Sequence, residues 1–89
     1  MNGEFRVWVD FCRFDEEGNR IAPTRAKKTN LAVESLLVEK GRMHHDQATL
    51  HFSDGTHVGP FPYDRRDPKS NAAKVARNYQ RWLYAQSGR

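Results

Sequence analysis

The chain has 89 residues, which suits one small domain, and its formal net charge is +4 at neutral pH. Hydrophobic residues make up 37% and charged residues 29% of the sequence, which allows one modest core and excludes a composition typical of disorder. The single cysteine, Cys12, excludes an intramolecular disulfide and favours a reducing compartment.

Nothing in the sequence indicates export or membrane insertion. The first ten residues lack the cationic segment and apolar run of a signal peptide, and no apolar run approaches membrane-spanning length. We therefore expect a soluble, cytoplasmic protein with no membrane partner.

Residues 5–14 predict a strand, because apolar residues at the odd positions alternate with polar residues. The odd side is the expected core face. The even side carries Trp8, Cys12 and Phe14, which make it too apolar for open water, so another element or a partner should cover it. Gly18 then predicts a hairpin turn, and a return strand over 20–25 should be short or lie at a sheet edge, because Pro23 cannot donate to a ladder.

Residues 30–41 fit two interpretations. Asn30 can cap a helix that Lys40 and Gly41 would end, whereas the short apolar stretch without a clean helical stripe is typical of a strand. We favour the helix.

Residues 48–61 predict a hairpin with Asp54 and Gly55 in a type I′ turn. A two-residue turn would pair Phe52 with His57 and would place His51 and His57 on opposite faces of the sheet.

The last segment predicts a helix with Asp67 as its N-cap and Pro68 at its first position, running to about Ala85. Its expected core side holds the following residues: Ala72, Val75, Ala76, Tyr79 and Leu83. The whole chain, 1–89, is thus expected to be a single α+β domain. It would have a small antiparallel sheet of about four strands in two hairpins, a C-terminal helix packed across the sheet, and a short helix near 30–40.

Positive charge gathers at the C-terminal end, where residues 64–89 hold seven cations and two anions. On the last helix Lys74, Arg77 and Arg81 share the side opposite the apolar stripe, with no acid three or four positions away. Such a face is typical of proteins that contact a phosphate backbone, and Tyr84 lies where it can stack on a base. The residues expected to bind nucleic acid are Arg65, Arg66, Lys69, Lys74, Arg77, Arg81, Tyr84, Arg25, Lys27 and Lys28.

Other chemistry receives little support from the sequence. The four histidines do not follow a zinc-binding spacing, and no serine lies in a nucleophile motif. We expect no metal, no cofactor and no enzymatic activity.

A protein partner is the alternative to nucleic acid. Trp8, Phe14 and Trp82 are of the residue types that dominate protein interfaces, and the chain is short, as are the small inhibitors and adaptors that phages and mobile elements encode. An acidic protein surface would also suit the basic helix, and a homodimer would cover the even side of the first strand.

Overall fold

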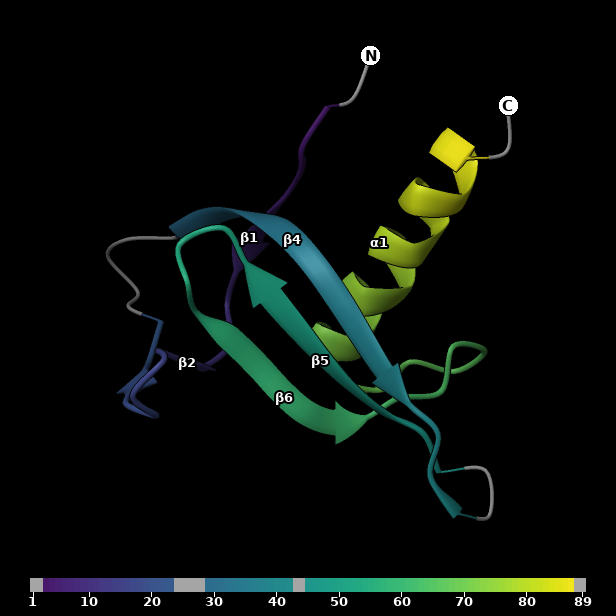
Figure 1. The fold of residues 1–89 in the computed structure, drawn as a ribbon, viewed down its shortest axis with the longest axis horizontal. Helices are drawn as coiled ribbons and strands as arrows, with labels where there is room; N and C mark the ends of the chain where they lie inside the picture. The colour runs from purple at the N-terminus through teal and green to yellow at the C-terminus, as the bar shows by residue number, and fades with distance from the viewer. Residues whose placement is uncertain (1–2, 24–28, 43–44, 88–89) are drawn as a thin grey trace.

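The computed structural model describes residues 3–23, 29–42 and 45–87, which form a six-stranded antiparallel sheet with one C-terminal helix packed against it (Figure 1). The elements are β1 (Phe5–Val9), β2 (Arg13–Phe14), β3 (Arg20–Ile21), β4 (Thr29–Glu39), β5 (Gln47–Phe52), β6 (His57–Pro62) and α1 (Asn71–Ser87). The strand order in the sheet is β1-β4-β5-β6-β2-β3. The predicted α+β class and the packed C-terminal helix are confirmed.

The sheet has to curl because β1 and β2 are almost continuous in the chain and yet stand four strand positions apart. In a flat sheet that separation would be about 19 Å. The four residue steps from Val9 to Arg13 reach at most about 14 Å. The predicted single strand over 5–14 is therefore split, with its first half on β4 and its second half on β6. Phe11, in the break, turns inward against Phe52, with 6.3 Å between ring centroids.

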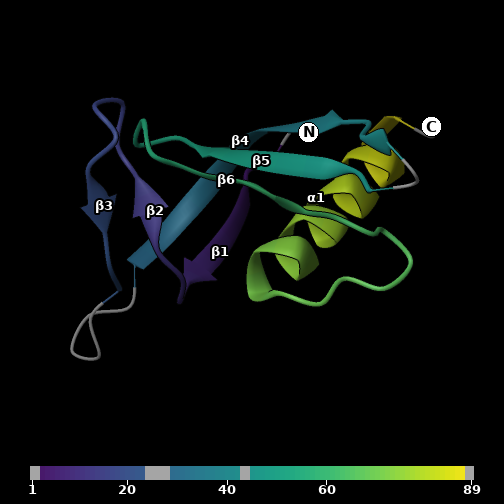
Figure 2. The same ribbon diagram turned by 90° about the horizontal axis from the view of Figure 1, so that it is seen from below.

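The core lies between the concave side of the sheet and α1 (Figure 2). Leu50 and Phe52 of the central strand β5 are almost fully buried. Ala73 and Ala76 of the helix face Leu50 and Phe52. Because these alanine side chains are small, the helix can approach the sheet closely. Tyr79 closes this layer and donates a hydrogen bond from its hydroxyl to the Glu34 carbonyl oxygen at 3.1 Å. The sheet's other face, turned away from α1, we call the outer sheet face.

The prediction of a helix near 30–40 is wrong. This segment is β4, the longest strand, which pairs with β1 on one side and β5 on the other. A β-bulge between Val33 and Ser35 explains the ambiguous pattern. Leu31 and Val33 face the core before the bulge, and Leu36 and Val38 face it afterwards, so the alternation changes phase within the strand.

The β2–β3 hairpin forms as predicted, with Gly18 at a φ of +86° in its turn. The return strand is shorter than expected and lies at the edge of the sheet, in agreement with the position of Pro23 just beyond it.

The hairpin of β5 and β6 is also confirmed, but its register is shifted by one residue. The Phe52 N–H donates to the Thr56 carbonyl, and the Gly55 N–H donates to the Phe52 carbonyl, so three residues form the loop instead of two. Gly55, at a φ of +89°, provides the left-handed residue that this loop requires. His51 consequently pairs with His57 on the same face, which overturns the prediction that they lie on opposite faces.

The helix begins later than predicted. Its N-cap is Ser70, whose hydroxyl oxygen accepts a hydrogen bond from the Ala73 N–H at 3.1 Å. Asp67 instead lies in a preceding turn, where its N–H donates to the Asp64 carbonyl at 3.1 Å. Leu83, which was expected in the core, is 42% exposed, whereas Ala73, which was not expected there, is buried. The helix is thus rotated slightly about its axis relative to the predicted orientation.

Candidate nucleic-acid interface

The segment between β6 and α1 is held against the helix by Tyr63, which is buried. Its N–H donates to the Asp46 carbonyl at 3.0 Å, and its hydroxyl donates to Gln80 Oε1 at 2.5 Å. The carboxylate of Asp64 then accepts a hydrogen bond from the Arg66 N–H at 2.9 Å. These bonds order the backbone that carries Arg65 and Arg66, which loops out on one flank of α1 (Figure 1).

An open hollow of about 910 Å³ lies between this segment and the helix. We call it the basic groove. Its lining residues come from both elements and are Arg65, Arg66, Arg77, Gln80, Arg81, Leu83, Tyr84 and Ser87. Four guanidinium groups therefore border one concavity, and two of them come from a segment that precedes the helix in the chain.

A second hollow of about 600 Å³ continues from the basic groove, since both are lined by Arg65, Arg66 and Gln80. This second hollow has mixed charge, because Lys40, Asp46 and Asp64 line it together with Arg65 and Arg66. All the charged residues that line the basic groove are therefore cations, whereas two carboxylates line the second hollow.

Among the described residues, no carboxylate forms an ion pair with a groove arginine. Within residues 3–23, 29–42 and 45–87, the ion pairs join Arg6 to Glu4, Arg13 to Asp54 and Lys69 to Asp67. Arg65, Arg66, Arg77 and Arg81 belong to none of these pairs in the described part of the chain. Cations that share a concave surface reinforce each other's potential, and such a surface attracts an anion from solution.

The positive charge of the groove also affects the pKa of Tyr63. Burial raises the pKa of its hydroxyl above the usual 10.0, while the nearby charges of Arg65 and Arg77 oppose that rise. The hydroxyl thus stays protonated at neutral pH and keeps its hydrogen bond to Gln80.

Arg77 is the most enclosed of the four groove arginines. It is partly buried, and its Nε is a buried donor for which the described residues supply no acceptor. Arg81, one turn further, is exposed. Tyr84 follows at the end of the groove with 80% of its surface exposed.

Five predicted binding residues do not line the groove: two lie elsewhere on the surface, and three fall outside the described residues. Lys69 is exposed and lies 3.9 Å from Asp67, and it does not line the basic groove. Lys74 is exposed on the outermost side of the helix, also away from the groove lining. The predicted contacts of the second basic run, Arg25, Lys27 and Lys28, fall outside the described residues.

The sequence prediction missed Gln80, Leu83 and Ser87, which line the basic groove, and Lys40, which lines the second hollow. A helical wheel places Gln80 about 60° from Arg77, so this residue could have been found from the sequence. Leu83 was assigned to the core, and Lys40 to the end of a helix that does not form.

Of the three residues predicted to bind a protein partner, one is exposed and two are partly buried. Trp8 is 63% exposed on the outer sheet face. Phe14 is partly buried and packs beside His57, with 6.1 Å between ring centroids. Trp82 is partly buried against Phe5 and Tyr79, so its ring contributes to the edge of the core.

The outer sheet face also carries the histidine pair that the shifted register creates. The rings of His51 and His57 are 5.9 Å apart between centroids. Cys12 accepts hydrogen bonds from Arg20 on the neighbouring strand, at 3.1 and 3.3 Å. Within the described part of the chain, no group of three or more histidine, cysteine, aspartate and glutamate side chains is arranged to hold a metal ion.

The fold and groove together describe a small α+β domain with a curled antiparallel sheet, one packed helix and a cationic concavity beside that helix. Comparison with protein-family models, curated proteins and solved structures found no match to this chain. Among the described residues, no helix has the length and apolar character needed to cross a membrane.

Proposed function

We propose that this protein is a non-enzymatic binding module that contacts the phosphate backbone of nucleic acid through the basic groove. The observation that supports this most strongly is the convergence of Arg65 and Arg66 with Arg77 and Arg81 on one hollow. Side chains separated by more than ten residues are brought to one surface, and the described carboxylates do not pair with them.

The chemistry of the groove suits phosphate. A guanidinium group offers donors in a planar fork that matches phosphate oxygens and remains charged at all relevant pH values. Neutralising several phosphates releases counterions, which is the main source of affinity in sequence-independent binding. Backbone contacts of this kind position a protein on nucleic acid without selecting a sequence.

A salt titration of binding tests the proposal. Arg66→Glu/Arg81→Glu, at two exposed groove positions, should abolish measurable binding to short DNA and RNA oligonucleotides at 50 mM salt and leave the thermal midpoint nearly unchanged. The parent protein should lose affinity steeply as salt rises, with a slope of about 0.9 per phosphate neutralised in duplex DNA and about 0.7 in single strands.

The matched control is Arg20→Glu/Arg42→Glu, which changes net charge equally at two exposed positions outside the groove lining. It should bind much more tightly than the groove variant. Equal loss in both variants would show that overall charge, and not the groove, attracts the ligand. Polyglutamate that binds as tightly as the oligonucleotides would instead favour an acidic protein surface as the partner.

Trp8 motivates a second candidate, a protein-binding module of the inhibitor or adaptor type. Its ring is 63% exposed on β1, a strand at the edge of the sheet. Exposed tryptophans contribute disproportionately to protein interfaces. This function predicts partner capture that tolerates moderate salt and is lost in Trp8→Ala. A light-scattering mass of twice the monomer that reverts in the same variant would identify a homodimer as the partner.

A further inference from the structure

The lining of the basic groove includes an aromatic side chain that the core does not use. Tyr84 is 80% exposed and Leu83 beside it is 42% exposed, and both line the groove together with Arg77 and Arg81. On a helix whose other aromatic residues, Tyr79 and Trp82, pack inward, an outward ring next to two guanidinium groups requires an explanation.

We propose that the groove takes unpaired nucleotides, with one base stacked on Tyr84 and the adjoining phosphates on the groove arginines. This inference rests on the function proposed above and names the form of nucleic acid. Aromatic rings that interleave with cations along a groove are the physical basis of single-strand binding, because every base offers a π-face once it is unpaired. In a duplex the bases are stacked on each other and offer no face to the ring.

The shape of the surface argues against a duplex in the same place. An α-helix with its side chains is about 10–12 Å across, and it nearly fills a B-form major groove about 12 Å wide. Here the segment that carries Arg65 and Arg66 borders the hollow alongside α1, so the helix does not protrude alone on this side. The groove cations therefore face a concavity. A flexible single strand can enter this concavity, whereas the major groove of a duplex cannot enclose cations that lie inside it.

The residues on the outermost side of the helix are not those of the groove. Lys74 and Asn78 are exposed there, and neither lines the hollow. Insertion of α1 into a duplex would use that outer side. Arg81 lies only about 20° from Lys74 around the helix and could serve both modes, so Tyr84 and Lys74 are the positions at which substitutions separate them.

Fluorescence anisotropy with labelled 12-nucleotide probes tests the inference. The probes are single-stranded DNA, single-stranded RNA and a DNA duplex of the same length. We expect at least one single strand to bind about tenfold or more tightly than the duplex. Tyr84→Ala should weaken single-strand binding about 5- to 150-fold, because stacking on one base is worth about 1–3 kcal/mol. Tyr84→Phe, which keeps the ring, should remain within about twofold of the parent.

Lys74→Ala serves as the control for the outer side of the helix and should weaken single-strand binding by less than about threefold. Because Tyr84 is largely exposed, its variants should keep the parent thermal midpoint. Duplex binding that equals or exceeds single-strand binding, or a Tyr84→Ala variant that binds like the parent, overturns the inference and leaves the proposed function standing. A parent protein that binds none of the three probes at 50 mM salt overturns both.

Discussion

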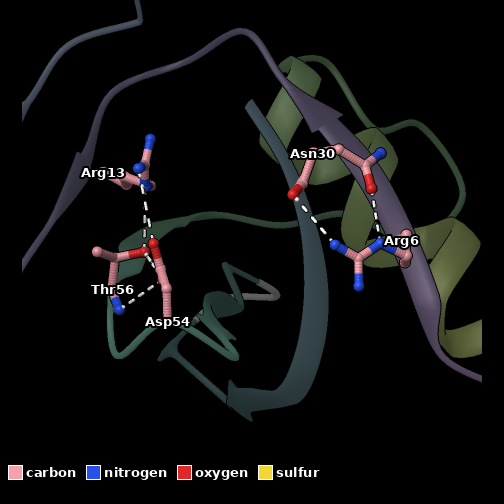
Figure 3. A network of polar contacts seen from close by, with 5 residues as sticks. All are labelled: Arg6, Arg13, Asn30, Asp54 and Thr56. Atoms are coloured by element: carbon pink, nitrogen blue, oxygen red, sulfur yellow. Dashed lines mark hydrogen bonds and ion pairs between the residues drawn. The ribbon is translucent and has the colours of Figure 1, made fainter. Parts of the chain in front are cut away.

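Arg13 on β2 donates a hydrogen bond from its Nε to the hydroxyl oxygen of Thr56, which directly precedes the neighbouring strand β6, at 3.1 Å. Its Nη2 also lies 3.6 Å from Asp54 Oδ2, and Thr56 in turn donates to Asp54 Oδ1 through its N–H and its hydroxyl (Figure 3). The side chain of Arg13 is only 10% exposed. One cation thus joins the second half of the split first strand to the loop of the β5–β6 hairpin.

Arg13→Ala should lower the free energy of unfolding by about 1–3 kcal/mol, because it removes a buried charged donor to Thr56 and leaves the carboxylate of Asp54 without its cation. Arg6→Ala is the matched control. Arg6 makes shorter contacts, 2.6 Å to Asn30 and 2.8 Å to Glu4, but its side chain is 49% exposed. We expect it to cost less than about 1 kcal/mol in urea denaturation. A control variant that costs as much as Arg13→Ala would show that contact length, and not burial, sets the contribution.

Asp54 should make part of the stability depend on pH. Its burial opposes ionisation, but hydrogen bonds from Thr56 and the charge of Arg13 outweigh that effect and hold the pKa below the usual 3.8. A lowered pKa in the folded state stabilises the fold above pH 3.8, and this contribution is lost as pH falls through the folded value. The difference in unfolding free energy between the parent and Asp54→Asn should be constant from pH 5 to 7.

Below about pH 4 that difference should shrink towards zero. Asp15, whose pKa is lowered chiefly by a hydrogen bond from the Asn19 backbone, titrates in the same range but is present in both proteins. A difference that stays constant down to pH 2.5 would contradict the assigned role of Asp54.

Gly59 should tolerate no side chain. Its φ is +127°, and a Cβ there would lie 2.6 Å from the Ala48 carbonyl oxygen and 2.8 Å from the Thr49 Cα. Both atoms belong to the backbone of the paired strand, so neither can move aside alone. Gly59→Ala should cost about 2–4 kcal/mol in thermal or urea unfolding.

Gly18 provides the comparison for Gly59, because it also has a positive φ, +86°, but a Cβ there would meet open space. Gly18→Ala should cost only about 1 kcal/mol, the penalty of the left-handed conformation itself. Equal costs at the two glycines would argue against the close approach of β5 and β6 at Gly59.

Ser70 should contribute more to helix stability than Asp67. Ser70→Ala removes the acceptor for the Ala73 N–H and should cost about 1 kcal/mol. Asp67→Ala removes an exposed contact to Lys69 at 3.9 Å and should change stability by less than about 0.5 kcal/mol. The reverse order, measured by thermal unfolding, would restore Asp67 as the cap that the sequence pattern suggested.

Local signals in the sequence were sufficient where neighbouring residues determine the structure. The turn glycines Gly18 and Gly55 and the apolar stripe of the last helix predicted two hairpins and a terminal helix, and all three are present. These signals failed where a bulge or a competing local turn intervenes. The bulge after Val33 removed the alternation from β4, and Ser70 displaced Asp67 as the helix cap because the intervening turn closes on Asp64.

The sequence alone determined the fold class, because turn residues and periodicity act over a few positions, and it determined the excess of positive charge near the C-terminus. Tertiary packing decided which cations share a surface. Arg65 and Arg77 line one groove because the buried Tyr63 anchors the intervening segment to Gln80 on the helix. Lys69 and Lys74, equally basic and closer to each other in the chain, lie outside it. Charge is a property of composition, whereas its focusing depends on which side chains the folded backbone brings together.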